Sequence, residues 1–302
     1  MSNETAVVEQ TYAPAGLDEP TILDAFGLTS NALLGSGGEA RIFALDAARV
    51  LRIQGSAEPD RALARLLDSW KGVDLGFGLP QILEQHRSPR QSYSIDVRLP
   101  GTPLSQWLAN TPYPHARRRG LTSLLDAASR LRELPLPRPG FDRVLSDEQR
   151  FQSLTELLAA QIEVGLRHSQ GLLAAAVPGL DRHVDRLLQQ LESRVVEPAF
   201  CHADLGPANV LVDDDGRVTA VLDISVHALA ADPVLDQVAA VAFLELTPYP
   251  GNLDDAAWLQ QELTRQLAAD AWLIDAYRRF YALYYAMDPG LTPWCAKQLL
   301  AA

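Results

Sequence analysis

The sequence predicts an α+β fold with a small N-terminal lobe, made of a β-sheet and one helix, and a larger, mainly helical C-terminal lobe. Residues 33–53 and 91–99 contain short apolar runs, broken by glycines or alternating with polar residues, as in strands and hairpins. Later in the chain apolar residues recur at helical spacing, for example at Leu121, Leu124 and Leu125. A length of 302 residues is sufficient for two lobes.

The N-terminal lobe is expected to span residues 18–98, after a segment of residues 1–17 that lacks periodicity and is expected to be flexible. Its predicted elements are a helix over 20–28, strands over 33–45 and 50–53, and a helix over about 58–70. A glycine-rich turn interrupts the first strand region, and its residues are Gly35, Ser36, Gly37 and Gly38. Glycines let backbone N–H groups approach a phosphate without a Cβ in the way, although such a turn alone is also typical of a simple hairpin.

An alternating strand ends near Leu99, where Pro100-Gly101 interrupts the strand pattern. The C-terminal lobe is expected to span residues 105–302. Helical periodicity is predicted over 148–166 and 181–194, and as two helices over 254–287.

The strongest chemical signal is the motif His202-x-Asp204-x-x-x-x-Asn209, followed by Asp223. Two β-branched runs separate Asn209 from Asp223, and an Asp-Gly pair between them predicts a tight hairpin. The hairpin would fold Asp223 back beside Asn209. The simpler interpretation, an ordinary loop with a surface acid, does not account for the hairpin and the spacing together.

These residue types suit phosphoryl transfer, in which a protein mainly positions the nucleophile and neutralises charge. Asp204 would accept a hydrogen bond from a substrate hydroxyl and take its proton. Asn209 and Asp223 would supply hard oxygen ligands to Mg²⁺.

The chain resembles the aminoglycoside phosphotransferase superfamily of kinase-like small-molecule enzymes. The resemblance rests on the His202 to Asn209 motif, on Leu222-Asp223, on Asp232-Pro233-Val234-Leu235-Asp236 and on the linker Leu99-Pro100-Gly101-Thr102-Pro103-Leu104. Together these motifs cover about residues 33–246. Asp232 lies nine residues beyond Asp223, one more than the family pattern leads us to expect.

The resemblance implies a protein-kinase-like, two-lobed fold and transfer of the γ-phosphoryl group of ATP, or of GTP, to a hydroxyl of a small molecule with Mg²⁺. The leading acceptor is an antibiotic of the aminoglycoside, macrolide or peptide-nucleoside type. The implied site contains Asp204 as the catalytic base, Asn209 and Asp223 as metal ligands, and His202 and Asp232 in support. Nucleotide would bind to Gly35, Ser36, Gly37, Gly38, to Arg52 in the place of the usual lysine, and to the backbone of Val97 and Arg98.

Several alternatives stay open at this point. The resemblance also fits a metabolic kinase acting on choline, a sugar or an amino alcohol. A nucleotide-binding pseudokinase is a further alternative, because only Glu58 and Asp60, at the start of the helix expected over 58–70, are available as acidic partners of Arg52. A protein kinase is disfavoured, because no Asp-Phe-Gly or Ala-Pro-Glu segment follows Asp223.

Composition favours a globular cytoplasmic protein, a monomer or a homodimer, with 47% hydrophobic and 21% charged residues. No apolar run approaches the ~20 residues of a membrane span, and the N-terminus lacks the basic start of a signal peptide. Cys201 and Cys295 are too few for a disulfide framework or a zinc site, and Cys201 is expected to be a small buried residue.

The net charge of −12 disfavours nucleic-acid binding, which requires a basic surface. It is compatible with a cationic acceptor, and equally with an acidic surface that serves solubility. Six acids near the expected acceptor region are candidates to face a cationic ligand: Asp254, Asp255, Glu262, Asp270, Asp275 and Asp288.

Overall fold

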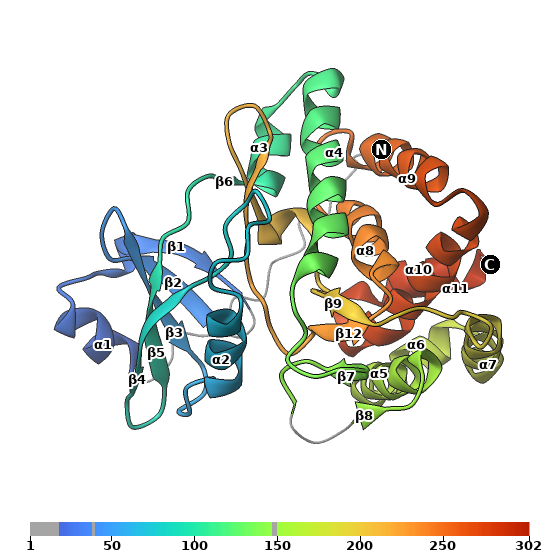
Figure 1. The fold of residues 1–302 in the computed structure, drawn as a ribbon, viewed down its shortest axis with the longest axis horizontal. Helices are drawn as coiled ribbons and strands as arrows, with labels where there is room; N and C mark the ends of the chain where they lie inside the picture. Colours follow the sequence, from blue (N-terminus) through green and yellow to red (C-terminus); the bar gives the residue numbers. More distant parts are fainter. Residues whose placement is uncertain (1–17, 38–39, 147–149, 302) are drawn as a thin grey trace, which may run out of the picture. The chain divides into compact units, whose positions relative to one another are not determined.

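A computed structural model describes residues 18–37, 40–146 and 150–301. The chain divides into two compact units, which are described separately (Figure 1). Unit 1 comprises residues 1–68 and 79–99, and unit 2 comprises residues 69–78 and 100–302. The segment over 1–17, expected to be flexible, and Gly38 lie outside the described residues.

Unit 1 contains a five-stranded antiparallel sheet in the order β1-β2-β3-β5-β4. Its elements are α1 (Glu19–Ala25), η1 (Ser30–Ala32), β1 (Leu33–Ser36), β2 (Ala40–Ala44), β3 (Arg49–Gln54), α2 (Arg61–Ser69), β4 (Ile82–Arg87) and β5 (Ser92–Val97). Alternation places Phe43, Leu51 and Ile53 on one face, where they pack with Ile22 and Leu23 of α1. The helices expected over 20–28 and 58–70 are confirmed with shifted ends, and β4 was not predicted from the sequence.

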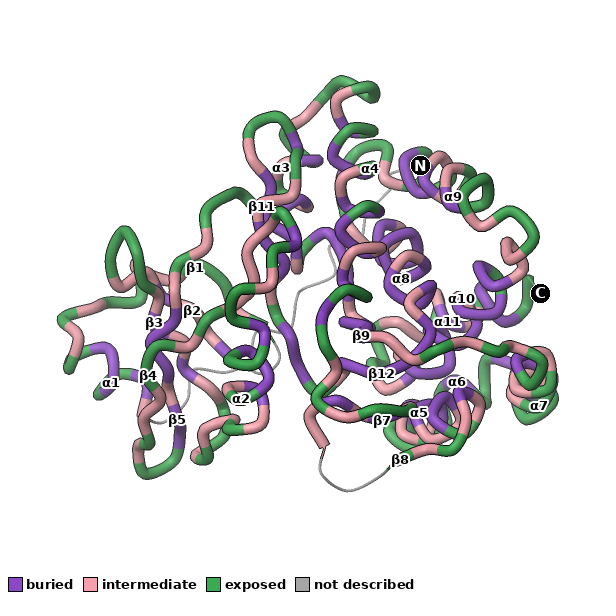
Figure 2. The backbone as a smooth tube through the Cα atoms, in the orientation of Figure 1, coloured by how far each residue is buried: buried purple, intermediate pink, exposed green. Residues whose placement is uncertain are grey.

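Unit 2 is mainly helical. Its helices are α3 (Leu104–Asn110), α4 (Pro114–Arg130), α5 (Leu154–His168), α6 (Leu172–Ala176), α7 (Leu180–Leu191), α8 (Val234–Leu244), α9 (Asn252–Leu267), α10 (Trp272–Tyr284) and α11 (Thr292–Leu300). Figure 2 shows α8 buried along most of its length, and its apolar residues have almost no exposed area. A helix apolar on all sides belongs in a core, and here the neighbouring helices α4, α9 and α10 contact it.

Two small sheets accompany these helices. Strands β11 (Val218–Val221), β10 (Val210–Val212) and β6 (Thr102–Pro103) form one. The other contains β8 (Arg150–Phe151), β7 (Phe141–Arg143), β12 (Leu229–Ala231) and β9 (Ala199–Cys201). Short 3-10 turns complete the unit, namely η2 (Leu131–Glu133), η3 (Pro207–Asn209), η4 (Ala268–Asp270), η5 (Tyr285–Met287) and η6 (Pro289–Leu291).

Gly101 in the expected linker is required by local geometry. Its φ is +124°, and a Cβ there would approach Oγ1 of Thr219 to 2.4 Å and the backbone oxygen of Val212 to 2.9 Å. Residues other than glycine rarely adopt that backbone conformation. A Gly101 substitution would therefore strain the backbone and push against the β10–β11 hairpin.

Residues 69–78 fell within the expected N-terminal lobe, but they belong to unit 2. Trp70 explains the difference, because its Nε1 donates to the Pro135 backbone oxygen at 2.9 Å and its ring meets Phe200 edge-on at 4.7 Å. Gly78 exchanges backbone hydrogen bonds with Thr219 and Val221 of β11. These contacts of residues 69–78 were not predicted from the sequence.

The C-terminal helices agree with the predicted periodicity, because α9 and α10 cover the range expected for two helices. The helix expected over 148–166 begins later, at Leu154, since the Ser153 side chain accepts a hydrogen bond from the Glu156 N–H and caps the first turn. Helix α11 was not predicted.

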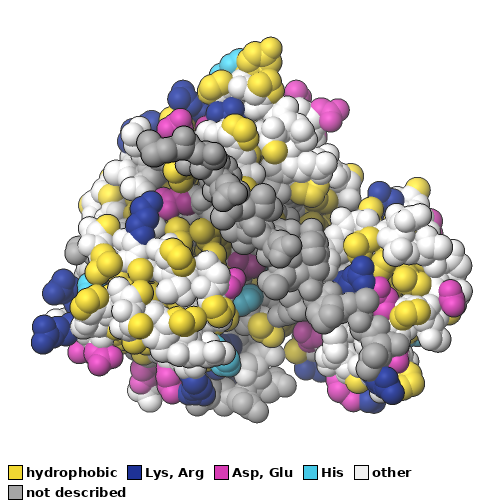
Figure 3. Space-filling model, turned by 180° about the vertical axis from the view of Figure 1, so that it is seen from behind, with side chains coloured by type: hydrophobic (Ala, Val, Ile, Leu, Met, Phe, Trp, Pro, Cys, Tyr) yellow, Lys and Arg dark blue, Asp and Glu magenta, His cyan; other side chains and the backbone are white. Residues whose placement is uncertain are grey.

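Cys201 and Cys295 are buried free cysteines, and Cys201 has no exposed area, as expected for a small core residue. Within the described ranges, every helix is too short or too polar to cross a bilayer. On the face drawn in Figure 3, basic, acidic and apolar side chains are interspersed.

Candidate active site

The predicted catalytic loop runs from the end of β9 to η3 and is held at its start by Asp236 of α8. The two carboxylate oxygens of Asp236 accept the backbone N–H groups of His202 and Ala203, each at 2.8 Å. Ala203 has a φ of +60°, an uncommon value for a residue with a side chain. Because the Ala203 N–H is bound by Asp236, this carboxylate helps to fix the strained turn that precedes Asp204.

Asp236 is 1% exposed, and burial raises its pKa to about 6, although the nearby His202 and the two N–H groups act in the opposite direction. Asp232 anchors the start of α8, because its Oδ1 accepts the Val234 N–H at 3.0 Å while Arg194 and Tyr277 bind its Oδ2. The contact of Asp236 with the catalytic loop was missed.

His202 connects the catalytic loop to the segment that carries Asp223. Its ring is fully buried, its Nε2 lies 2.7 Å from the Leu222 backbone oxygen, and its Nδ1 lies 3.3 Å from the Asp204 backbone nitrogen. With Nε2 as the donor and Nδ1 as the acceptor, a neutral ring satisfies both contacts. His202 thus connects the catalytic loop to the residue that precedes Asp223.

Asp204 and Asn209 contact each other directly. The amide nitrogen of Asn209 donates to the Asp204 backbone oxygen at 2.9 Å and to its carboxylate Oδ2 at 3.2 Å. Because the amide nitrogen is bound in this way, Oδ1 of Asn209 remains the group that could coordinate a cation. Asp204 is half-buried, at the edge of a well-packed loop.

The predicted hairpin is present and brings Asp223 to Asn209. Val210 pairs with Val221 across the hairpin, and the Leu222 N–H donates to the Asn209 backbone oxygen at 2.8 Å. Asp223 is exposed and has a φ of +59°, so a second uncommon backbone conformation occurs at a predicted site residue. Such conformations cluster at functional sites.

Asp204, the predicted base, has a further partner that the sequence did not reveal. The Tyr285 hydroxyl donates to Oδ1 of Asp204 at 2.6 Å. Tyr285 lies within the range expected for two helices, in η5, directly after the end of α10. No motif signals this contact, because 81 residues separate the two side chains.

In unit 1, the glycine-rich turn joins β1 to β2. Ser36 pairs with Arg41, and the Gly37 N–H donates to the Ala40 backbone oxygen at 2.9 Å, which closes the turn. A Cβ added at Gly35 or Gly37 would meet no described atom within 4 Å. The glycines are therefore not required by packing, which is compatible with a turn whose backbone must be approachable.

Arg52 and Asp96 lie on the same face of the sheet. Arg52 of β3 pairs with Ser94 of β5, and Asp96 is two residues further along β5, a diagonal distance that long side chains span. Burial raises the pKa of Asp96, whereas Ser94 and the positive charge of Arg52 lower it. Asp96 on strand β5 is therefore an acidic partner of Arg52. The two helix-start acids have other contacts, because Glu58 pairs with Arg87 and Asp60 caps Leu63.

The backbone N–H groups of Val97 and Arg98, expected near the nucleotide base, both have partners inside unit 1. The Val97 N–H donates to the Gln81 oxygen at 2.9 Å and the Arg98 N–H to the Ala48 oxygen at 2.8 Å. Both donors are engaged within the sheet and its turns, so these two residues could offer a base only their carbonyl oxygens.

Of the six candidate acids, Asp255 is excluded by burial, whereas three others keep a partly exposed carboxylate beside an arginine. Asp255 pairs with Arg117 and both are buried; the other pairs are Glu262 with Arg265, Asp270 with Arg194, and Asp275 with Arg279. Asp288 caps Gly290. Asp254 remains as an exposed acid in the first turn of α9.

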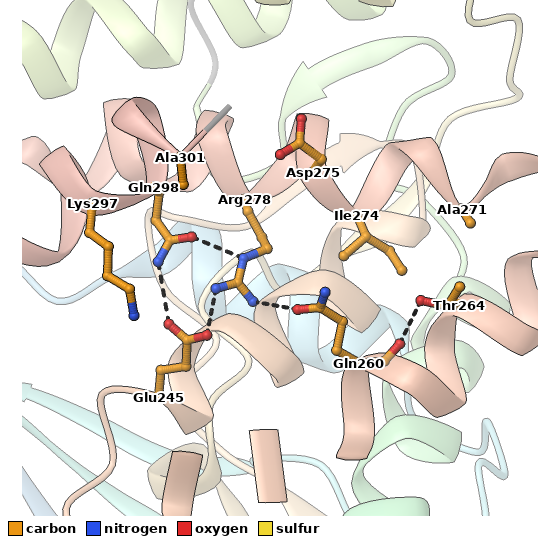
Figure 4. A pocket seen from close by; sticks show the side chains of 10 residues that line it. All are labelled: Glu245, Gln260, Thr264, Ala271, Ile274, Asp275, Arg278, Lys297, Gln298 and Ala301. Carbon is orange, nitrogen blue, oxygen red and sulfur yellow. Dashed lines mark hydrogen bonds and ion pairs between the residues drawn. The ribbon is translucent and has the colours of Figure 1, made fainter. Parts of the chain in front are cut away.

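A separate hollow of about 400 Å³ lies between α9, α10, α11 and the end of α8 (Figure 4). Arg278 crosses it and donates to Gln298 and Gln260, each at 3.0 Å, and to Glu245 at 2.5 Å. Of the residues singled out from the sequence, only Asp275 lines this hollow.

The chain matches a model of the phosphotransferase enzyme family over residues 48–273. No curated protein sequence matches it. Similar solved structures include a thermostable mutant of aminoglycoside phosphotransferase APH(4)-Ia in a ternary complex with ADP and hygromycin B, with a TM-score of 0.71 and 19% identity over 94% of this chain and 96% of that one. A gentamicin complex of APH(2'')-IIa has a TM-score of 0.58 and 12% identity over 95% and 96%. APH(3'')-Id from Streptomyces rimosus has a TM-score of 0.52 and 20% identity over 89% and 96%.

Proposed function

Because this chain belongs to the phosphotransferase enzyme family, we propose that it transfers the γ-phosphoryl group of ATP to a hydroxyl of an antibiotic of the aminoglycoside class. One observation carries the proposal. The Asn209 side chain donates a hydrogen bond to the Asp204 carboxylate. The Asn209 backbone oxygen accepts one from the N–H of Leu222, the residue before Asp223, so the three predicted site residues lie in one place.

Each of the three residues has a separate task. Asp204 accepts a hydrogen bond from the acceptor hydroxyl, orients it for in-line attack and takes its proton as the new P–O bond forms. Oδ1 of Asn209 and the carboxylate of Asp223 are hard oxygen donors of the kind that Mg²⁺ prefers, so their chemistry fits this metal. When bound, Mg²⁺ would neutralise charge on the transferred phosphate.

Unit 1 supplies the residues for the nucleotide in this proposal. The turn at Gly35, Ser36 and Gly37 offers backbone N–H groups, and Arg52 offers a guanidinium that can hold phosphate oxygens in a bidentate manner. Asp96 gives Arg52 a carboxylate neighbour on the adjacent strand. This arrangement weakens the argument for a pseudokinase, which relied on the missing acidic partner.

The acceptor class rests on the similar structures. Two of them were solved with hygromycin B or gentamicin, and their folds match nearly the whole of this chain. A metabolic kinase acting on a small alcohol is the competing proposal. A panel that includes aminoglycosides, macrolides, choline and sugars distinguishes the two.

The test is ATP consumption with that panel, by the wild type and by Asp204→Asn. We expect turnover with at least one aminoglycoside, and a fall of about 10²- to 10⁴-fold in the variant, because the substitution keeps the shape but removes the base. Nucleotide affinity should survive. Asp223→Ala is the matched comparison, because it should weaken Mg²⁺-dependent nucleotide binding. Wild-type turnover by Asp204→Asn would overturn the assigned base, and turnover with choline or sugars alone would overturn the acceptor class.

A further inference from the structure

We propose that the Tyr285 hydroxyl is a positioning group for Asp204, holding its carboxylate in the orientation that receives the acceptor hydroxyl. This inference rests on the proposed function. It starts from the 2.6 Å hydrogen bond between the Tyr285 hydroxyl and Oδ1 of Asp204. Since Asn209 donates to Oδ2 at 3.2 Å, each carboxylate oxygen has one fixed donor, and rotation of the carboxylate would break both bonds.

The ring of Tyr285 is held by neighbours on several sides, which gives its hydroxyl a fixed place. Phe243 of α8 meets the ring edge-on at 5.1 Å, and Tyr284 does so at 5.2 Å. His227 stacks on it with centroids 5.7 Å apart and an interplanar angle of 22°. Aromatic contacts of this kind restrict both torsions of the side chain.

His227 is itself held in place. Its Nδ1 lies 2.7 Å from the Tyr284 hydroxyl. Consecutive tyrosines thus perform different tasks: Tyr284 holds His227 against the ring of Tyr285, and Tyr285 holds Asp204. These contacts give His227 an indirect part in placing the carboxylate of Asp204.

Helix α8 anchors the catalytic loop at other points. Phe243, which packs on Tyr285, also lies against Gly206, where an added Cβ would meet the Phe243 Cβ at 3.2 Å. Asp236, near the start of the same helix, binds the backbone before Asp204. The backbone of the loop therefore has supports of its own, and the Tyr285 hydroxyl is the support that acts on the carboxylate.

Tyr285 is suited to donate a hydrogen bond. Burial, and then the adjacent Asp204 carboxylate, raise the pKa of Tyr285 well above its usual value, so the phenol keeps its proton. The titratable groups nearest the ring are Asp204, His227, Tyr281 and Tyr284. A neutral hydroxyl that donates to a carboxylate forms a charge-assisted bond, stronger than one between neutral partners.

The experiment measures kcat and the KM of both substrates in Tyr285→Phe, alone and combined with Asp204→Asn. We expect kcat to fall about 10- to 100-fold, the loss associated with one hydrogen bond to a charged group, with little change in either KM. In the Asp204→Asn background the same substitution should cost almost nothing, because no charged carboxylate is left to hold. A purely structural role of Tyr285 would lower activity in both backgrounds.

Tyr281→Phe is the matched control. It removes a hydroxyl from α10, the helix just before Tyr285, that donates to the Leu235 backbone oxygen at 3.2 Å. Its kcat should stay near that of the wild type. If the wild type turns over and Tyr285→Phe equals it, or if the two substitutions act additively, the inference fails while the proposed function stands. If the wild type phosphorylates no acceptor, the proposed function fails and the inference falls with it.

Discussion

Single side chains in this protein fix the backbone of the catalytic loop from a distance along the chain. Asp236 takes two N–H donors, His202 bridges to Leu222, and Asn209 turns its amide nitrogen toward Asp204. Because the contacts of Asn209 use its amide nitrogen, its Oδ1 stays available to a cation. The unusual φ values of Ala203 and Asp223 cost free energy, and these contacts are what offsets it.

In unit 1, Asp96 tests whether a single side chain also holds Arg52 in place. Asp96→Asn preserves shape but removes the negative charge beside Arg52, so the guanidinium should lose its fixed orientation toward phosphate. We expect the KM for MgATP to rise about 10-fold, equivalent to about 1.4 kcal/mol, measured by steady-state kinetics at saturating acceptor. Asp46→Asn is the control, because Asp46 is exposed and pairs with Arg49 on a turn. Equal KM values for the two variants would contradict the assigned role.

At the scale of secondary structure, two consecutive acids of α9 differ in burial and in their partners. Asp255 is 3% exposed and binds both Arg117 of α4 and the Tyr249 hydroxyl, whereas its neighbour Asp254 is exposed. Arg117 also donates to the backbone oxygens of Thr111 and Pro112, just before α4. The pair therefore joins two helices of unit 2 and is not free to bind a ligand.

Removing one partner of a buried ion pair leaves the other charge uncompensated. Asp255→Ala should accordingly lower the free energy of unfolding by about 3 to 5 kcal/mol, as measured by chemical denaturation. Asp254→Ala, one residue away, should change it by less than about 0.5 kcal/mol, the usual range for surface substitutions. A stable Asp255→Ala protein with a raised KM for the acceptor would restore the expectation that this acid faces the ligand.

Across the whole molecule, the features that could be predicted from the sequence are those formed by residues close together in the chain. The hairpin that returns Asp223 to Asn209 is a local structure with an Asp-Gly turn, and β5 of unit 1 follows from alternation, whereas β4 was not predicted. Contacts between distant segments were not predictable from one sequence. Tyr285 approaches Asp204 across 81 residues, and Asp236 reaches His202 across 34.

The net charge of −12 is the one property of the whole chain that bears on the acceptor. If the acceptor is polycationic, several carboxylates act on it jointly, and a Debye length of ~10 Å at 0.1 M salt screens them together. Its KM should therefore rise severalfold as salt is increased, whereas the KM for MgATP, held by short-range contacts, should change less. Asp255 is not available for this effect, because it is buried in an ion pair with Arg117. An acceptor KM that ignores salt would indicate a neutral or anionic acceptor held by hydrogen bonds and aromatic contacts, and the acidic surface would then serve solubility alone.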